Sequence, residues 1–357
     1  MADTYQIIGL MSGTSLDGVD LACCRFAIEN DHWNFVIEQA ETIPYNEKWK
    51  QRLADMMQGS AVDYVKTHVE LGHYFGDLLK DFISKYKCQP LLIASHGHTV
   101  FHQPSLGFTA QIGDGSQIAA ITGIDTVCDF RSKDVALKGQ GAPLVPAGEV
   151  RLFKEFSFCL NLGGIANITI VKDQRLVAFD ICPANMALNF LSSKLGADYD
   201  HDGVMAVKGK VIQSLVEKLN QLDYYHLPYP KSLGKEWFDY NMKPLLNESG
   251  ILIEDVMASV CRHIAVQIKN AIKEFQPGSK DRLLITGGGA FHPLLIKFIR
   301  EETAMEIVIP EKTVIEFKEA MVFAFLGLLF YRNEKNVMKA VTGATIDHIG
   351  GALYKGG

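Results

Sequence analysis

The chain has 357 residues and a formal net charge of -6, and 48% of its residues are hydrophobic and 21% charged. This length exceeds the usual size of one hydrophobic core, so we expect about two domains. The composition excludes a disordered, collagen-like or coiled-coil protein. An acidic balance with dispersed Lys and Arg residues argues against nucleic acid as the main partner.

Two features of the sequence argue against export and against a membrane location. Residues 1–6 lack the basic start and apolar run of a signal peptide. The most apolar stretch, residues 320–331, is shorter than the roughly 20 residues that span a bilayer, so we expect a buried helix there. The seven cysteines include no CxxC pair and are expected to be reduced core residues. We therefore expect a cytoplasmic protein without a membrane partner.

The predicted elements of the first half begin with a meander of three strands, whose first two are joined by a polar loop. Two helices follow, then a short buried strand, a helix and a further strand. Glycines and a proline then make an irregular stretch, where we place a domain hinge. These elements are predicted at residues 7–11, 19–26 and 34–44 for the meander, and then at 49–57, 61–86, 91–95, 113–122, 125–130 and 139–143.

The second half repeats this outline, because it also begins with a strand-loop-strand hairpin followed by another strand. The alternation of strands and helices predicts an α/β fold, and the repeated hairpin predicts an internal duplication of that fold. Its strands are predicted at residues 156–162, 167–172, 175–180 and 282–286, and its helices from 186 and 211 and at 254–275 and 291–302.

The loop between the first two strands concentrates glycines, hydroxyls and carboxylates. Glycines let backbone amides approach an oxyanion, and a carboxylate can hold magnesium directly or through water. Asp17 and Asp20 are the candidate magnesium ligands. An ordinary hairpin turn is the alternative. The candidate nucleotide-binding residues of this loop are Gly13, Thr14, Ser15, Leu16, Asp17, Gly18, Val19 and Asp20.

Two glycine-rich turns in the second half extend the nucleotide hypothesis. Asn161, Gly163 and Gly164 lie in the matching hairpin, and two such hairpins could bind one polyphosphate. Gly287, Gly288 and Gly289 follow a strand and open a helix, where a base or ribose can lie against bare backbone. A Rossmann dinucleotide site is the alternative there, although the full GxGxxG pattern is absent.

Asp180 ends an apolar strand, so its carboxylate is expected at a strand tip, where α/β enzymes place catalytic groups. The alternative is that Asp180 caps the helix that begins near Met186.

Three histidines, His96, His98 and His102, share one face if their segment is a strand, which raises zinc as an alternative to structural or ligand-contacting roles. We expect His98 and Thr99 to contact the substrate. Arg131 lies among further charges just before the hinge, and its planar fork suits a carboxylate-bearing substrate.

Taken together, these segments resemble the anhydro-N-acetylmuramic acid kinases, of the actin-like, sugar kinase and heat-shock ATPase superfamily. The most diagnostic segment is GLMSGTSLDGVD at residues 9–20. Others lie at residues 95–102, 129–131, 139–146, 161–167, 179–185, 230–232, 287–290 and 318–320.

The resemblance implies a two-domain actin-like, ribonuclease H-like fold with ATP and magnesium in an interdomain cleft. The implied domains are residues 1–135 with about 336–357, and residues 136–335. The implied reaction converts 1,6-anhydro-N-acetylmuramic acid and water to N-acetylmuramic acid 6-phosphate, in peptidoglycan recycling. Asp180 is implied as the base that activates the water, and Glu319 as an assisting residue. We also expect a homodimer.

One motif departs from the family pattern. Cys182 stands where the family has glycine, and Asn189 stands where it has an acid, so the catalytic loop is expected to differ locally. Two rival hypotheses stay open: an actin-like kinase for another sugar or carboxylate, and a non-catalytic actin-like sensor.

Overall fold

The computed structural model describes residues 3–30, 32–247 and 250–357. The chain divides into two compact units. The first comprises residues 1–154 and 317–357, and the second comprises residues 155–316. These boundaries differ from those expected, because residues 136–154 and the apolar helix over residues 317–331 pack with the first unit.

The first unit is built on one mixed sheet whose strand order is β12-β6-β4-β1-β2-β3, with β5 paired to β4. The meander β1-β2-β3 is antiparallel, whereas β4 is parallel to both β1 and β6. The strands are β1 (Asp3–Ser12), β2 (Gly18–Glu29), β3 (His32–Pro44), β4 (Leu92–Gln103), β5 (Phe108–Ile112), β6 (Thr126–Cys128) and β12 (Ala352–Tyr354).

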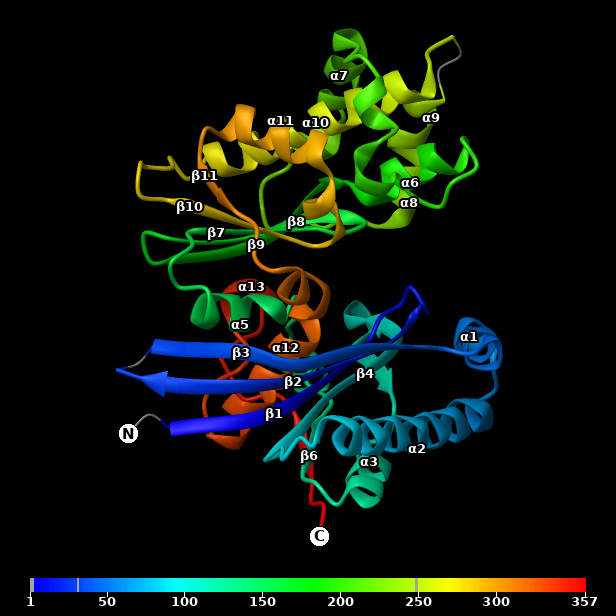
Figure 1. Ribbon diagram of the computed structural model, residues 1–357, viewed down its shortest axis with the longest axis vertical. Helices are drawn as coiled ribbons and strands as arrows, with labels where there is room; N and C mark the ends of the chain where they lie inside the picture. The colour runs from blue at the N-terminus through cyan, green and yellow to red at the C-terminus, as the bar shows by residue number, and fades with distance from the viewer. Residues whose placement is uncertain (1–2, 31, 248–249) are drawn as a thin grey trace. The chain divides into compact units, whose positions relative to one another are not determined.

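Alternation along the strands gives this sheet two apolar faces. Ile8 and Leu10 of β1 belong to a core cluster with α2, whose Leu71 and Phe75 are fully buried. Figure 1 shows α2 running along this side of the sheet with α3 beside it. The helices that lie wholly or in part in the first unit are α1 (Glu47–Ala54), α2 (Ala61–Tyr86), α3 (Gly115–Thr122), α4 (Ser132–Ala136), α5 (Val145–Leu152), α12 (Lys312–Tyr331) and α13 (Lys339–Thr342).

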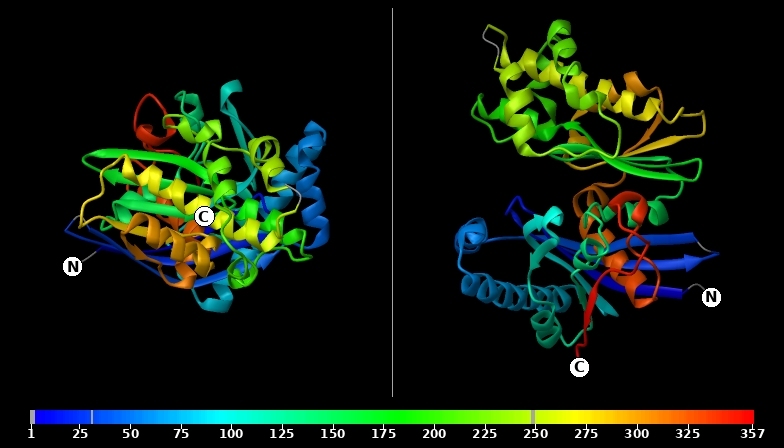
Figure 2. Two further views of the ribbon diagram at one scale, coloured as in Figure 1. Left: turned by 90° about the horizontal axis from the view of Figure 1, so that it is seen from above. Right: turned by 180° about the vertical axis from the view of Figure 1, so that it is seen from behind.

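Helix α12 packs on the opposite face of the sheet. Its Phe325 contacts Phe26 of β2 and Trp33 of β3, with ring centroids 5.3 and 5.1 Å apart. The helix begins in the second unit and is kinked at Phe317 (φ -110°), where the chain enters the first unit. The C-terminal strand β12 pairs with β6 (Figure 2, right). The predicted buried helix at residues 320–331 is therefore confirmed as part of α12.

The second unit has its own sheet, with the order β11-β10-β7-β8-β9. The meander β7-β8-β9 is again antiparallel, and β10 is parallel to β7 and β11. The strands are β7 (Phe158–Leu162), β8 (Ile165–Lys172), β9 (Arg175–Pro183), β10 (Arg282–Thr286) and β11 (Glu306–Val308).

Helices of the second unit cover one face of this sheet, and α10 and α11 lie side by side over it (Figure 1). They are α6 (Asn185–Ser193), α7 (Gln213–Asn220), α8 (Lys235–Trp237), α9 (Lys243–Leu246), α10 (Ile253–Lys273) and α11 (Pro293–Thr303).

In each unit, the three strands of the meander and the two parallel strands beside them follow the order 3-2-1-4-5. This numbering runs along the chain and leaves out β5 and β12 of the first unit. The predicted α/β fold, its ribonuclease H-like strand arrangement and its internal duplication are thus confirmed. Each of the seven cysteines is free, and all but Cys128 are buried, as expected. Among the described residues, no helix combines the length and apolar character needed to cross a membrane.

Candidate functional site

The loop between β1 and β2 is a turn folded around its own carboxylate. Asp17 Oδ1 accepts hydrogen bonds from Ser15 Oγ (2.8 Å) and from the Gly18 N–H (2.9 Å). The Leu16 N–H donates to Gly13 O over 3.4 Å, and Leu16 adopts a φ of 60°. Thr14, Ser15 and Asp17 are exposed. The loop therefore presents side chains and backbone to a ligand without needing one to hold its shape.

The last three residues of the predicted loop, Gly18, Val19 and Asp20, lie at the start of β2 and contribute to the sheet. A Cβ on Gly18 would lie 2.5 Å from Ile43 O, so glycine here permits the close approach of β3. Val19 is fully buried in the core. Asp20 is half-buried, and its Oδ1 accepts a hydrogen bond from Thr42 Oγ1 over 2.5 Å. Gly18 and Val19 therefore serve the packing of the sheet.

The three histidines lie along β4, whose backbone has a φ of 72° at Gly97 and whose register with β1 shifts there. His96 Nε2 accepts from Arg131 Nε (3.0 Å), and the His96 ring lies against α12. His98 Nδ1 contacts Ser12 Oγ at 3.1 Å, and His102 Nδ1 contacts Thr109 Oγ1 at 3.1 Å. Burial lowers the pKa of all three imidazoles.

No group of three or more His, Cys, Asp or Glu side chains in the described ranges could hold a metal ion. Each of the three imidazoles instead has a different hydrogen-bond partner within the protein. Thr99, next to His98, is half-buried, and its hydroxyl is 3.4 Å from Gln111 Nε2.

Arg131 is a largely enclosed cation. Its Nη1 donates to Gly141 O over 2.7 Å while its Nε donates to His96, so two of its three nitrogens are engaged by the protein. Burial lowers the pKa of Arg131 to about 10, against the opposing effect of Glu319 and Asp134. The guanidinium therefore stays charged at neutral pH.

Glu319 lies in the same unit and within electrostatic reach of Arg131. It follows the kink of α12 and is exposed, whereas its neighbour Lys318 points inward to a buried ion pair with Glu149 (2.8 Å). The kink and this ion pair fix the direction in which Glu319 projects. The first unit thus brings together two of the predicted site residues, Arg131 and Glu319.

In the second unit, three polar residues lie in register across neighbouring strands: Asn161 pairs with Asn167, and Asn167 pairs with Asp180. Because their neighbours along the strands belong to the helix-covered core, alternation directs these side chains to the opposite face. Between the Asn167–Asp180 and Ala166–Cys182 pairs, Ile181 is an extra residue, which makes a β-bulge. The bulge lies directly beside Asp180.

Asp180 is held by the segment that follows helix α7. Its Oδ2 accepts from the Leu233 N–H (2.9 Å), and its own N–H donates to Lys231 O (3.0 Å). Tyr224 donates its hydroxyl proton to the Asp180 carbonyl over 2.7 Å. Within the part of the chain that the structure describes, Asp180 Oδ1 has no hydrogen-bond partner. Burial raises the pKa of Asp180, partly offset by the Leu233 N–H, so its carboxylate is a stronger base than an exposed one.

Asp180 does not cap a helix. Helix α6 begins at Asn185, and its N-cap residue, Ala184, makes no side-chain cap. Instead the carbonyls of Gly163 and Gly164 accept from the N–H groups of Asn185 and Ala184, at 3.1 and 2.8 Å. The N-cap alternative is therefore wrong, because the turn of the hairpin satisfies the start of the helix.

The two glycine segments of the second unit lie together. A Cβ on Gly287, whose φ is 80°, would lie 2.7 Å from Asn161 Oδ1. Gly289 approaches Leu162 equally closely, whereas Gly164 has open space where its Cβ would be. Asn185 Nδ2 donates to Leu162 O (3.0 Å) and braces the same junction. The departures at Cys182 and Asn189 are local, since Cys182 is buried in the core and Asn189 is exposed on α6.

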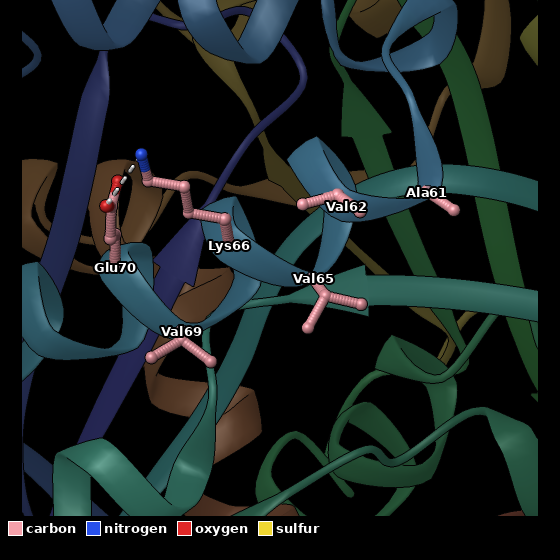
Figure 3. A pocket seen from close by; sticks show the side chains of 6 residues that line it. All are labelled: Ala61, Val62, Val65, Lys66, Val69 and Glu70. Atoms are coloured by element: carbon pink, nitrogen blue, oxygen red, sulfur yellow. Dashed lines mark ion pairs between the residues drawn. The ribbon is translucent and has the colours of Figure 1, made fainter.

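A separate groove runs along the exposed face of α2 (Figure 3). Its lining is mainly apolar, and its charged groups, Lys66 and Glu70, form an ion pair of 3.9 Å with each other. None of the predicted site residues lines it. It lacks the convergent polar groups that fix a ligand in a binding site.

A family model described as anhydro-N-acetylmuramic acid kinase matches residues 5–356. The chain belongs to the anhydro-N-acetylmuramic acid kinase family. It is 35% identical over 371 residues to the anhydro-N-acetylmuramic acid kinase of Vibrio vulnificus, covering 99% of each chain. It is 37% identical over 362 residues to that of Vibrio cholerae, covering 97% of each. The family predicted from the sequence motifs is confirmed, and with it the assignment as a phosphotransferase.

Solved structures include a more distant likeness. Component A of the (R)-2-hydroxyglutaryl-CoA dehydratase of Acidaminococcus fermentans matches with a TM-score of 0.45 and 10% identity, covering 90% of this chain and 97% of that one.

Sequence reasoning missed several residues that hold the site together. Ser12 and Tyr45 contact the region of the first hairpin and His98, and Leu233 holds the carboxylate of Asp180. Ser12 lies within the segment quoted at residues 9–20 but was not named as a site residue, and nothing in the sequence marks Tyr45. Backbone donors such as the Leu233 N–H carry no sequence signal at all.

Proposed function

We propose that this kinase transfers the γ-phosphoryl group of ATP to the oxygen released when water opens 1,6-anhydro-N-acetylmuramic acid, with Asp180 as the general base. The product is N-acetylmuramic acid 6-phosphate, and the reaction serves peptidoglycan recycling. Membership of the anhydro-N-acetylmuramic acid kinase family supports this substrate.

The observation that carries the proposal is the environment of Asp180. A general base must be near its proton, unprotonated at working pH and basic enough to take that proton. Asp180 has one oxygen fixed by the Leu233 N–H and the other without a partner among the described residues. Its raised pKa makes the carboxylate more basic, and its lack of a cationic partner in the described contacts leaves that basicity intact.

The reaction balances with one base. Asp180 accepts a proton from water, and the water oxygen forms a bond to the anomeric carbon. The bond from that carbon to the bridging oxygen breaks, and this oxygen takes the phosphoryl group, so ADP leaves. We assign Glu319 an assisting role, because its exposed carboxylate lies within electrostatic reach of Arg131. The preceding residue, Lys318, forms a buried ion pair with Glu149 that orients this part of α12.

The two hairpins are proposed phosphate sites, and Gly287, Gly288 and Gly289 a proposed adenosine site. Exposed Thr14 and Ser15 and the backbone of the first loop support this role, as does the open space at Gly164. His98, Thr99 and Arg131 are proposed sugar contacts.

Magnesium fits the first loop through its carboxylates. Asp17 Oδ2 has no hydrogen bond within the described residues, and Asp20 is half-buried nearby in sequence. Because two carboxylates do not complete the six oxygen ligands that magnesium prefers, water and phosphate oxygens would supply the rest. The ion would neutralise phosphate charge when bound.

The test uses mass spectrometry of the products formed from ATP, magnesium and anhydro-muramic acid in oxygen-18 water. We expect one label on the anomeric oxygen and none in the phosphate group. A phosphorylated product that keeps the anhydro ring, or label in the phosphate, would contradict the proposed coupling. The cytoplasmic location and the homodimer stay predictions, which cell fractionation and analytical ultracentrifugation would check.

A further inference from the structure

One segment of the second unit completes the outer edge of strand β9 at Asp180. Because β9 is the outermost strand of its sheet in the described ranges, its outer side presents backbone groups that no strand pairs there. The Asp180 N–H donates to Lys231 O over 3.0 Å, and the Asp180 carbonyl accepts from the Tyr224 hydroxyl over 2.7 Å. Residues 224–233 therefore take the place of a neighbouring strand at this position.

These two bonds hold the backbone on both sides of the Asp180 Cα. The N–H belongs to the planar peptide group before this atom and the carbonyl to the one after it, so holding both groups limits φ and ψ of Asp180. The direction of the Cα–Cβ bond follows from the backbone. A third bond, from the Leu233 N–H to Oδ2 (2.9 Å), then holds the carboxylate itself. The position of the carboxylate therefore depends on all three bonds.

Of these three bonds, the one from Tyr224 is made by a side chain of the segment, and the other two by its backbone. Its direction is fixed, because a carbonyl oxygen accepts and the phenol must donate. The bond acts on the peptide group that joins Asp180 to Ile181, the extra residue of the β-bulge, where the register with β8 shifts. One substitution at Tyr224 therefore removes this bond and leaves the partners of the other two in place.

Tyr224 is itself held in place by its surroundings. It is buried, and its ring packs against Trp237 with centroids 5.4 Å apart. The Lys231 ammonium lies 4.7 Å from the centroid of the Tyr224 ring and donates to the Tyr224 carbonyl over 3.1 Å. Tyr224 thus links strand β9 with the part of the segment, residues 231–233, whose backbone binds Asp180.

We propose that Tyr224 is a positioning residue for the base: its hydroxyl holds the Asp180 backbone so that the carboxylate keeps one direction. The role of Asp180 as the base rests on the proposed function, whereas the hold of Tyr224 on its backbone does not. A general base acts over hydrogen-bond distance, so a small displacement of the carboxylate slows proton transfer more than it weakens the binding of ATP or sugar. Loss of the Tyr224 hydroxyl should therefore lower kcat and leave KM nearly unchanged.

The first test compares the steady-state kinetics of Tyr224→Phe and Tyr225→Phe. Both tyrosines pack against Trp237, but the Tyr225 hydroxyl contacts His263 Nε2 (3.0 Å) instead of the Asp180 carbonyl, so Tyr225→Phe is the matched control. We expect Tyr224→Phe to lower kcat roughly tenfold, the size of one lost buried hydrogen bond, with KM for the sugar and ATP within about twofold. Tyr225→Phe should keep the wild-type kcat. An unchanged kcat in Tyr224→Phe, or an equal fall in both variants, would overturn the proposal.

The second test is a double-mutant cycle with Asp180→Asn. If Tyr224 acts through the base, its hydroxyl has no base left to position in the Asp180→Asn background. Tyr224→Phe should then change the residual turnover by less than about twofold. A further fall of roughly tenfold in the double variant would contradict the proposal, because it would show an effect that does not pass through Asp180.

The third test needs no turnover and follows amide hydrogen exchange in nitrogen-15-labelled protein without substrate. The Asp180 and Leu233 amides donate to Lys231 O and to the Asp180 carboxylate, so both should exchange about five times faster or more in Tyr224→Phe and at wild-type rates in Tyr225→Phe. Unchanged exchange in Tyr224→Phe would overturn the proposal. Full turnover in Asp180→Asn would instead count against the proposed function, and the exchange rates would still decide whether Tyr224 holds the Asp180 backbone.

Discussion

The two units share one strand order, but their hairpins are built from different groups. In the first unit the loop over residues 13–17 carries hydroxyls and a carboxylate, and it is held by Tyr45 at both ends. In the second unit the turn consists of Gly163 and Gly164, whose carbonyls satisfy the start of α6. One fold therefore supplies a side-chain site in one unit and a backbone site in the other.

The carboxylates follow the same division. In the first unit Asp20 lies on the middle strand of the meander, hydrogen-bonded to Thr42. In the second unit the middle strand carries neutral Asn167, and the acid, Asp180, lies on the outer strand beside a bulge. We expect the first unit to contribute the sugar contacts and one phosphate site, and the second to contribute the base and the other phosphate site.

Asp180→Asn tests this division most strongly. Asparagine keeps the size of the side chain and the bond from the Leu233 N–H but cannot accept a proton, so turnover should fall roughly a hundredfold or more while ATP still binds. Asp20→Asn, the matched change in the first unit, should mainly raise the KM for ATP with magnesium. Turnover assays and nucleotide titrations would check both. An active Asp180→Asn enzyme removes the base assignment.

Arg131→Ala sharpens the role of the first unit. A cation near the sugar should favour the lactyl carboxylate of muramic acid, so kcat/KM for that substrate should fall about tenfold or more relative to an anhydro sugar without the carboxylate. Equal losses for the two sugars would contradict the idea. Because Arg131 also donates to His96 and Gly141, the melting temperature of the variant must be measured alongside.

Gly287→Ala and Gly164→Ala separate packing from binding in the second unit. A Cβ at Gly287 would meet Asn161 at a backbone φ of 80°, so we expect a loss of about 1–3 kcal/mol in the free energy of unfolding. Gly164→Ala has open space and should leave stability unchanged while raising the KM for ATP. Chemical denaturation with kinetics would check this pair. A Gly164→Ala enzyme with wild-type KM would argue against a phosphate at that turn.

The pH dependence gives the smallest predicted effect. Because burial raises the pKa of Asp180, the acidic limb of kcat/KM should lie above the usual range of an aspartate. A raised folded-state pKa means that the charged form costs stability, and this cost appears as pH rises through that pKa. Asp180→Asn should therefore melt slightly higher than wild type at neutral pH, with the difference vanishing in acid. Calorimetry across pH would show the opposite sign if Asp180 were stabilised as a carboxylate.

The sequence predicted most of the framework, because long elements have strong local signals. Helix α2 was predicted at its observed bounds, since its apolar residues recur with a helical period, and β10 likewise, since it is a short run of mainly apolar residues. Strand β5 was missed: it is short and half-exposed, and it depends on pairing with β4. The unit boundary at residues 154 and 317 was also missed, because it depends on the tertiary contacts of α5 and α12.

The site was predictable only where its chemistry lies in unusual side chains. The clustered glycines and carboxylates drew attention to the hairpins, and a strand-end acid drew attention to Asp180. The positive φ of Gly97, between His96 and His98, was not foreseen, because an alternation rule carries no information about backbone dihedral angles. The network of Tyr45 and Ser12 requires contacts between residues 33 positions apart.

The interrupted first unit has a consequence for biosynthesis. Residues 155–316 form the second unit as one continuous stretch, whereas the first unit needs residues 317–357. Until α12 leaves the ribosome, the face of the sheet that bears Phe26 and Trp33 has no cover from Phe325. A nascent chain therefore carries an open apolar surface throughout the synthesis of a complete second unit, which makes the N-terminal strands a natural binding site for chaperones during translation.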